Sequence, residues 1–107
     1  MSEFKGASGP WSFHEEDGEG GQIVVADNGD VVCVVGSYMT SVEEDFANGP
    51  LIAAAPELLE ACLRIQAQFR QASIASVAGS LNPIEDNAAQ IDAVILKALG
   101  QQPLTGE

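Results

Sequence analysis

The stretch ANGPLIAAAPELLEACL, residues 47–63, decides where the two halves of the 107-residue chain meet. It contains a glycine, two prolines and then a run of good helix formers. Pro50 lacks a backbone N–H and disfavours helical geometry at Gly49. We therefore expect the helix that begins upstream to span only one or two turns and to break at 48–50. Pro56 is best tolerated in a first helical turn, so it predicts the start of a new helix.

The new helix is expected over 56–76; a continuous helix from residue 50, kinked at Pro56, is the competing interpretation. Apolar residues recur along it at alternating spacings of four and three, and a last helix expected over 83–99 repeats that pattern. Matched stripes predict an antiparallel helical hairpin with apolar surface left over for the sheet, for a second subunit or for both. The residues assigned to this packing or oligomer face are Leu51, Leu58, Leu59, Ile65, Phe69, Ile91 and Ile95.

Helix ends carry recognisable capping residues. Ser41 and Glu44 form a capping-box pattern at the start of the first, short helix. Asn82 and Pro83 predict the N-cap and first residue of the last helix. Gly100 predicts its end, because glycine readily adopts the left-handed conformation that closes a helix.

Three short β-strands are predicted before the first helix. Asn28 and Gly29 lie between two β-branched runs and predict a hairpin, because both tolerate the positive φ of a type I′ turn. The apolar run at 31–35 favours a strand that is buried on both faces or central in the sheet. The expected strands cover 10–15, 22–27 and 30–38. The predicted fold class is α+β: a three-stranded antiparallel β-meander followed by a short helix and an antiparallel two-helix hairpin.

One domain is expected over 10–100, with a flexible arm at 1–9 and a flexible tail at 101–107. No apolar run approaches the ~20 residues that cross a membrane, and the N-terminus lacks the pattern of a secretion signal. Cys33 and Cys62 lie in apolar runs and are expected to be reduced core thiols. These features predict a protein of the cytoplasm.

The charge is strongly acidic, with 16 acids, four bases and a formal net charge of −12. We do not expect the protein to bind nucleic acid directly, because phosphate affinity comes from clusters of lysine and arginine. Ten of the acids lie in residues 1–50 beside a single base, Lys5. Such a surface either keeps the protein in solution by self-repulsion or binds a basic partner.

No motif predicts catalysis, a cofactor or a metal site. His14 stands beside three carboxylates, which we interpret as a solvated acidic turn rather than a general base. Ser37 and Tyr38 precede a helix N-terminus, where they serve either capping or anion binding. Arg64 and Arg70 either pair with surface acids or face a phosphate ligand in an oligomer. The candidate partner or ligand surface comprises Glu15, Glu16, Asp17, Glu43, Glu44, Asp45, Ser37, Tyr38, Arg64 and Arg70.

Three segments together resemble a known group of proteins. GPWSF (9–13), DNGDVV (27–32) and residues 47–63 are similar to small bacteriophage and prophage accessory proteins with a GPW opening and an NAxLIAAAPELLEAL-type helix. Part of the ead-type accessory proteins of lambdoid phages has a similar layout. The chain departs from the pattern at Gly49 and Pro50. The resemblance implies a phage origin and a non-essential accessory role, with no catalytic residues to transfer.

Charge and resemblance together lead to one function hypothesis and two alternatives. We expect a non-enzymatic counter-defence or host-takeover protein whose acidic surface binds and inhibits a basic, nucleic-acid-binding host protein in the bacterial cytoplasm. The first alternative is an oligomer that sequesters a small nucleotide signal. The second is a structural or assembly oligomer of a phage. A homodimer is the expected oligomeric state, since a three-stranded sheet leaves edges to be covered.

Overall fold

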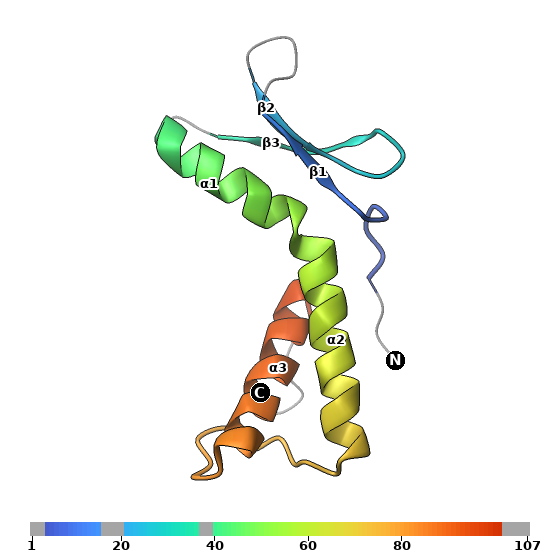
Figure 1. Cartoon of the computed structure of the whole chain (residues 1–107), viewed down its shortest axis with the longest axis vertical. Helices are drawn as coiled ribbons and strands as arrows, with labels where there is room; N and C mark the ends of the chain where they lie inside the picture. The colour runs from blue at the N-terminus through green and yellow to red at the C-terminus, as the bar shows by residue number, and fades with distance from the viewer. Residues whose placement is uncertain (1–3, 16–20, 37–39, 102–107) are drawn as a thin grey trace. The chain divides into compact units, whose positions relative to one another are not determined.

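A computed structural model of the chain describes residues 4–15, 21–36 and 40–101. It confirms the α+β class: a three-stranded antiparallel sheet is followed by three helices (Figure 1). The elements are β1 (Ser12–His14), β2 (Gln22–Val25), β3 (Val31–Val35), α1 (Val42–Ala53), α2 (Ala55–Gln71) and α3 (Pro83–Ala98).

The chain divides into two compact units. Residues 5–58 include the sheet and α1, and residues 59–107 with 1–4 include most of α2 and all of α3. The single domain expected over 10–100 stays a prediction. The expected arm and tail lie partly outside the described residues.

The sheet has the order β1-β2-β3, so β2 is central and β3 forms an edge. Phe13, Val24 and Cys33 lie opposite one another across the three strands and share one face. The expectation that the apolar run 31–35 is central or buried on both faces was wrong. Val34 points to the other face and is 69% exposed. An apolar sequence alone cannot reveal that this part of the outer face is not covered by any described residue of the unit.

The turn between β2 and β3 confirms the predicted hairpin but corrects its type. Gly29 N–H donates to the Ala26 carbonyl (2.9 Å), and Ala26 N–H donates to the Asp30 carbonyl (2.8 Å). Gly29 has a φ of 94°, whereas Asn28 is not among the residues with positive φ. The loop is therefore a type I turn followed by a left-handed glycine, rather than type I′.

Helix α1 packs against the inner face of the sheet, where Val24 is fully buried. The contact is close at Gly49. A Cβ built there would lie 2.2 Å from Cε1 of Phe13, so the aromatic ring occupies the space that any larger residue would need. Gly49 is itself buried within the helix. The sequence therefore has glycine at this position because of a tertiary contact.

The expected break at 48–50 was wrong. Helix α1 continues through Gly49 and Pro50 and ends at Ala53, with Ala54 as its C-cap. Pro50 removes one helical hydrogen bond, and the helix tolerates that loss. The interruption is confined to Ala54, just before Pro56 in the first turn of α2. The structure thus lies closer to the competing interpretation of a helix kinked near Pro56.

Helices α2 and α3 run side by side in opposite directions, as the predicted hairpin requires (Figure 1). Gln66 Nε2 on α2 donates to Asp92 Oδ1 on α3 at 2.7 Å. Ala88 and Ile95 of α3 are buried. Helix α2 ends at Gln71, five residues before the expected end at 76. Polar side chains and buried small residues thus contribute to the hairpin interior beside the apolar stripe.

The early end of α2 has a structural cause. Ser73 adopts a φ of 58°, its N–H donates to the Arg70 carbonyl (3.0 Å), and Ile74 N–H donates to the Phe69 carbonyl (2.9 Å). This pair of bonds is the Schellman closure that usually uses glycine. A serine in the left-handed conformation is uncommon, so the sequence pattern did not reveal this end.

The capping predictions are confirmed. Ser41 and Glu44 exchange both capping-box hydrogen bonds. Asn82 accepts from Ile84 N–H at 3.0 Å, Pro83 is the first residue of α3, and Gly100 closes the helix with a φ of 71°. Each cap depends only on near neighbours in sequence, which is why local pattern was sufficient.

Candidate binding surfaces

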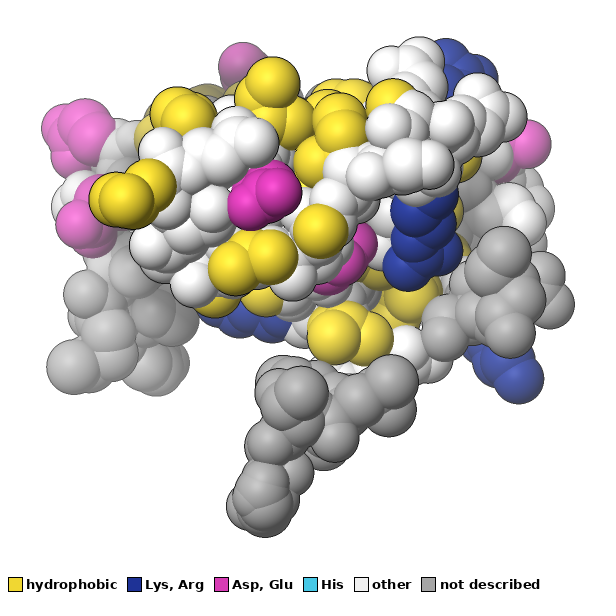
Figure 2. Space-filling model, turned by 90° about the horizontal axis from the view of Figure 1, so that it is seen from below, with side chains coloured by type: hydrophobic (Ala, Val, Ile, Leu, Met, Phe, Trp, Pro, Cys, Tyr) yellow, Lys and Arg dark blue, Asp and Glu magenta, His cyan; other side chains and the backbone are white. Residues whose placement is uncertain are grey.

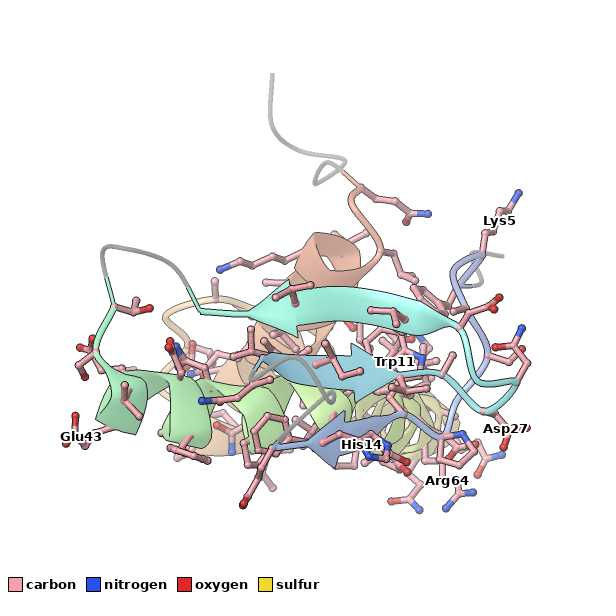
Figure 3. The ribbon with its side chains drawn as sticks, turned by 90° about the horizontal axis from the view of Figure 1, so that it is seen from above. Lys5, Trp11, His14, Asp27, Glu43 and Arg64 are labelled. Atoms are coloured by element: carbon pink, nitrogen blue, oxygen red, sulfur yellow. The ribbon has the colours of Figure 1, made fainter. Side chains whose placement is uncertain are left out.

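Exposed acids lie at two ends of the unit formed by the sheet and α1. Asp27 and Asp30 flank the β2–β3 turn, and Glu43 and Glu44 occupy the first turn of α1. Figure 3 shows Asp27 and Glu43 at opposite ends of the layer formed by the sheet and α1. The carboxylates of the α1 pair also stabilise the positive end of the helix dipole. We call Asp27, Asp30, Glu43 and Glu44 the acidic ends.

The acidic ends are not neutralised within the described part of the chain. There, the one ion pair joins Arg64 and Glu60 on α2, at 4.0 Å and between exposed side chains. Asp30 accepts from Asn28 Nδ2 and Glu44 accepts from Ser41 N–H, both uncharged donors. The negative charge of these side chains therefore remains available to solvent or to a partner.

Asp45 differs from its neighbours on α1. Its side chain faces inward, the residue is only 9% exposed, and Oδ1 accepts from Thr40 Oγ1 at 2.7 Å. A Cβ built on Gly36 would lie 2.8 Å from Asp45 Oδ2. Asp45 therefore connects the start of α1 to the end of β3 and contributes little to an exposed acidic surface.

The remaining candidates in this half of the chain are described only in part. His14 and Glu15 are exposed at the end of β1. Glu16, Asp17, Ser37 and Tyr38 lie outside the described residues. A partner or ligand surface that includes Glu15, Glu16, Asp17, Ser37 and Tyr38 stays a prediction.

The two candidate arginines lie on α2. Arg64 is exposed and reaches Glu60 one helical turn away. Arg70 is exposed in the last turn, where a cation stabilises the negative end of the helix dipole. Both positions have a local structural explanation. A phosphate ligand is therefore not needed to explain either arginine.

The structure divides the predicted packing face into an inner and an outer part. Ile95 is buried, and Leu59, Phe69 and Ile91 are half-buried. Leu58 and Ile65 of α2 remain 50% and 38% exposed. Figure 2 views the chain from the loop end of the hairpin, where hydrophobic side chains reach the surface between acidic and basic ones.

Two exposed residues on α3 were missing from the predicted face. Ile84 and Val94 are 48% and 47% exposed. The spacing of seven residues from Ile84 to Ile91 was the signal for Ile84, whereas Val94 has no apolar residue at that spacing. On a helix, positions seven apart lie almost on the same face.

Other kinds of site were searched within the same described ranges. They contain no group of three or more histidine, cysteine or acidic side chains placed to bind a metal ion. Cys33 and Cys62 are both free and half-buried. None of the helices that the structure describes is long and apolar enough to span a membrane.

The fold and these surfaces define a small α+β protein that presents unpaired acids on its sheet half and apolar residues on its helical hairpin. The chain belongs to the family of the Salmonella phage P22 protein Y8K6, which matches residues 1–102. It is therefore a phage protein. No curated protein and no solved structure matches the chain.

Proposed function

We propose that this phage protein is an accessory factor that acts by binding, without catalysis, and that its acidic ends bind a basic host protein in the bacterial cytoplasm. The observation that carries the proposal is the set of exposed carboxylates at Asp27, Asp30, Glu43 and Glu44, none of which has a cationic partner among the described residues. Unpaired surface charge of one sign attracts and orients a partner of the opposite sign.

The chemistry of the partner follows from this arrangement. A protein that binds nucleic acid presents lysine and arginine to the phosphate backbone. Two groups of carboxylates at separate places on one compact unit offer such a protein two points of charge complementarity. Occupying that basic surface would inhibit its binding to nucleic acid, which is the effect expected of a counter-defence or host-takeover protein. The accessory role rests on the resemblance of GPWSF and residues 47–63 to phage accessory proteins.

The test is capture from bacterial lysate over a series of salt concentrations, with bound proteins identified by mass spectrometry. The matched variant carries Asp27→Asn, Asp30→Asn, Glu43→Gln and Glu44→Gln. Glutamine at 44 preserves the capping box, so the helix start is retained. We expect basic nucleic-acid-binding proteins to be retained by the wild type, released as salt rises, and lost in the variant.

A control variant separates local from overall charge. Neutralising Glu57, Glu60, Glu85 and Asp86 removes the same number of acids from α2 and α3. Capture should survive this change if the acidic ends bind the partner. The proposal would be contradicted if capture persisted at high salt, or if the variant with neutralised acidic ends captured the same proteins as the wild type.

A further inference from the structure

Both helices of the α2–α3 hairpin carry exposed apolar residues beside the surface on which they meet. On α2, Leu59, Cys62 and Gln66 are half-buried, and Gln66 bonds to α3. Successive residues on a helix turn by about 100°, which places Leu58 and Ile65 roughly a quarter-turn away from that inner surface.

Helix α3 shows the same offset. Ala88 and Ile95 are buried, and Asp92 accepts from Gln66. Val94 lies about a third of a turn from Ala88 and Ile95, and Ile84, one helical turn before Ala88, lies about 40° from Ala88 in the same direction. The offset has the same rotational sense on α3 as on α2 when each helix is viewed from its N-terminus. Because the two helices are antiparallel and face one another, the two exposed rows lie on the same side of the hairpin.

We call this surface the hairpin face: Ala61 and Ile65 from α2, with Ile84, Ile91 and Val94 from α3. The charged residues of both helices fall outside it by the same geometry, including the Glu60–Arg64 pair on the opposite side. In a chain with a net charge of −12, this is a surface on which two copies meet with the least repulsion.

We propose that the hairpin face binds the hairpin face of a second copy, forming a symmetric dimer with a four-helix core. The seven-residue spacing of Ile84 with Ile91 is the repeat that brings helices together along a seam. A twofold axis brings the same face of both copies into contact, so this one uncharged surface forms both sides of the interface.

The size of the face is sufficient for such a dimer. Helices of this length extend about 25 Å, and two of them side by side are about 20 Å wide. The footprint is then about 500 Å² per copy, or about 1,000 Å² in total, which is the lower bound for a specific interface. A basic partner of the acidic ends would be a poor occupant, because the hairpin face offers it no carboxylate.

The test is the molar mass of the full chain, measured by light scattering after size exclusion over a wide concentration range. The wild type should have twice the 11.1 kDa of one chain. The double variant Ile65→Glu and Val94→Glu should be monomeric, with Kd weakened by about a hundredfold or more, because the new carboxylates would be buried without partners. Both positions are exposed in the single chain, so far-UV circular dichroism should stay unchanged.

The matched control is Ala67→Glu with Ala93→Glu, two exposed positions on the opposite side of the same helices. It adds the same charge and should remain dimeric. If the Glu pair at 65 and 94 unfolds the chain, the single variant Val94→Ser provides the comparison. A monomeric wild type, or a dimer that the changes at Ile65 and Val94 leave intact, would overturn the proposal.

Discussion

Replacing Gly49 with alanine tests the contact that places α1 on the sheet. The change should gain about 1 kcal/mol, because alanine favours a helix over glycine by that amount. It also places a Cβ 2.2, 2.4 and 2.7 Å from three atoms of the Phe13 ring, where ordinary contact begins at 3.4 Å. The ring or the helix must then move by about 1 Å, and overpacking of this kind costs up to about 3 kcal/mol.

The net expectation is a loss of about 2 kcal/mol in the free energy of unfolding. For a unit of this size, that loss lowers Tm by about 10 °C. Urea denaturation followed by far-UV circular dichroism measures the loss directly. Asn48→Ala, at an exposed position of the same helix, is the control for helix propensity and should be neutral or slightly stabilising.

A second variant identifies the clash as the cause. Phe13→Leu removes ring atoms from the space that the new Cβ would occupy, so Gly49→Ala should cost much less in that background. The reasoning is refuted if Gly49→Ala is as stable as the wild type. It is equally refuted if the losses from the two changes simply add, since residues in contact should show coupling.

Three further changes probe backbone geometry and capping. Gly36→Ala should destabilise by about 2 kcal/mol in urea denaturation, because Gly36 has a φ of 115° and its Cβ would lie 2.8 Å from Asp45 Oδ2. Gly29→Ala should cost about 1 kcal/mol from its φ of 94° alone, since no atom lies within 4 Å of the added Cβ, and Gly29→Asn should cost less in the same assay. Ser41→Ala should cost about 1 kcal/mol in thermal denaturation, because Glu44 N–H loses its acceptor, and Ser41→Thr should restore most of it.

Features that depend on near neighbours were predictable from sequence. The Ser41 capping box, the Asn82 cap and the Gly100 stop all formed as expected, because each is decided within one helical turn. A related detail was only partly visible. Asn82 N–H donates to Ser80 Oγ, which donates to Glu85 Oε1, so the box-like start of α3 passes through a serine in the preceding loop.

Features that depend on distant residues were not predictable in the same way. Gly49 and Pro50 are typical of a helix break, yet helix α1 continues through both. The glycine leaves space for the Phe13 ring, and the helix tolerates the one hydrogen bond that Pro50 removes. The apolar run at β3 was compatible with a central strand, and only the pairing order shows it to be an edge.

The candidate surfaces were also predictable only in part. Acidic composition and heptad spacing were visible in the sequence, and they identified Glu43 and Glu44 of the acidic ends and Ile65 and Ile91 of the hairpin face. Sequence spacing did not reveal that Asp45 turns inward to Thr40, or that Val94 lies on the exposed side of α3. Those assignments require the direction of each side chain.

The edge strand β3 has a consequence for the behaviour of the protein at high concentration. Its residues, VVCVV, include no proline and no charge, and such an edge is a template for pairing with other chains and for aggregation. The net charge of −12 makes copies of the chain repel one another, whereas β3 itself carries no charge that would do so. Near the sequence pI of about 4.1 that repulsion disappears, so precipitation should begin there through β3, and a lysine at Val34 should delay it.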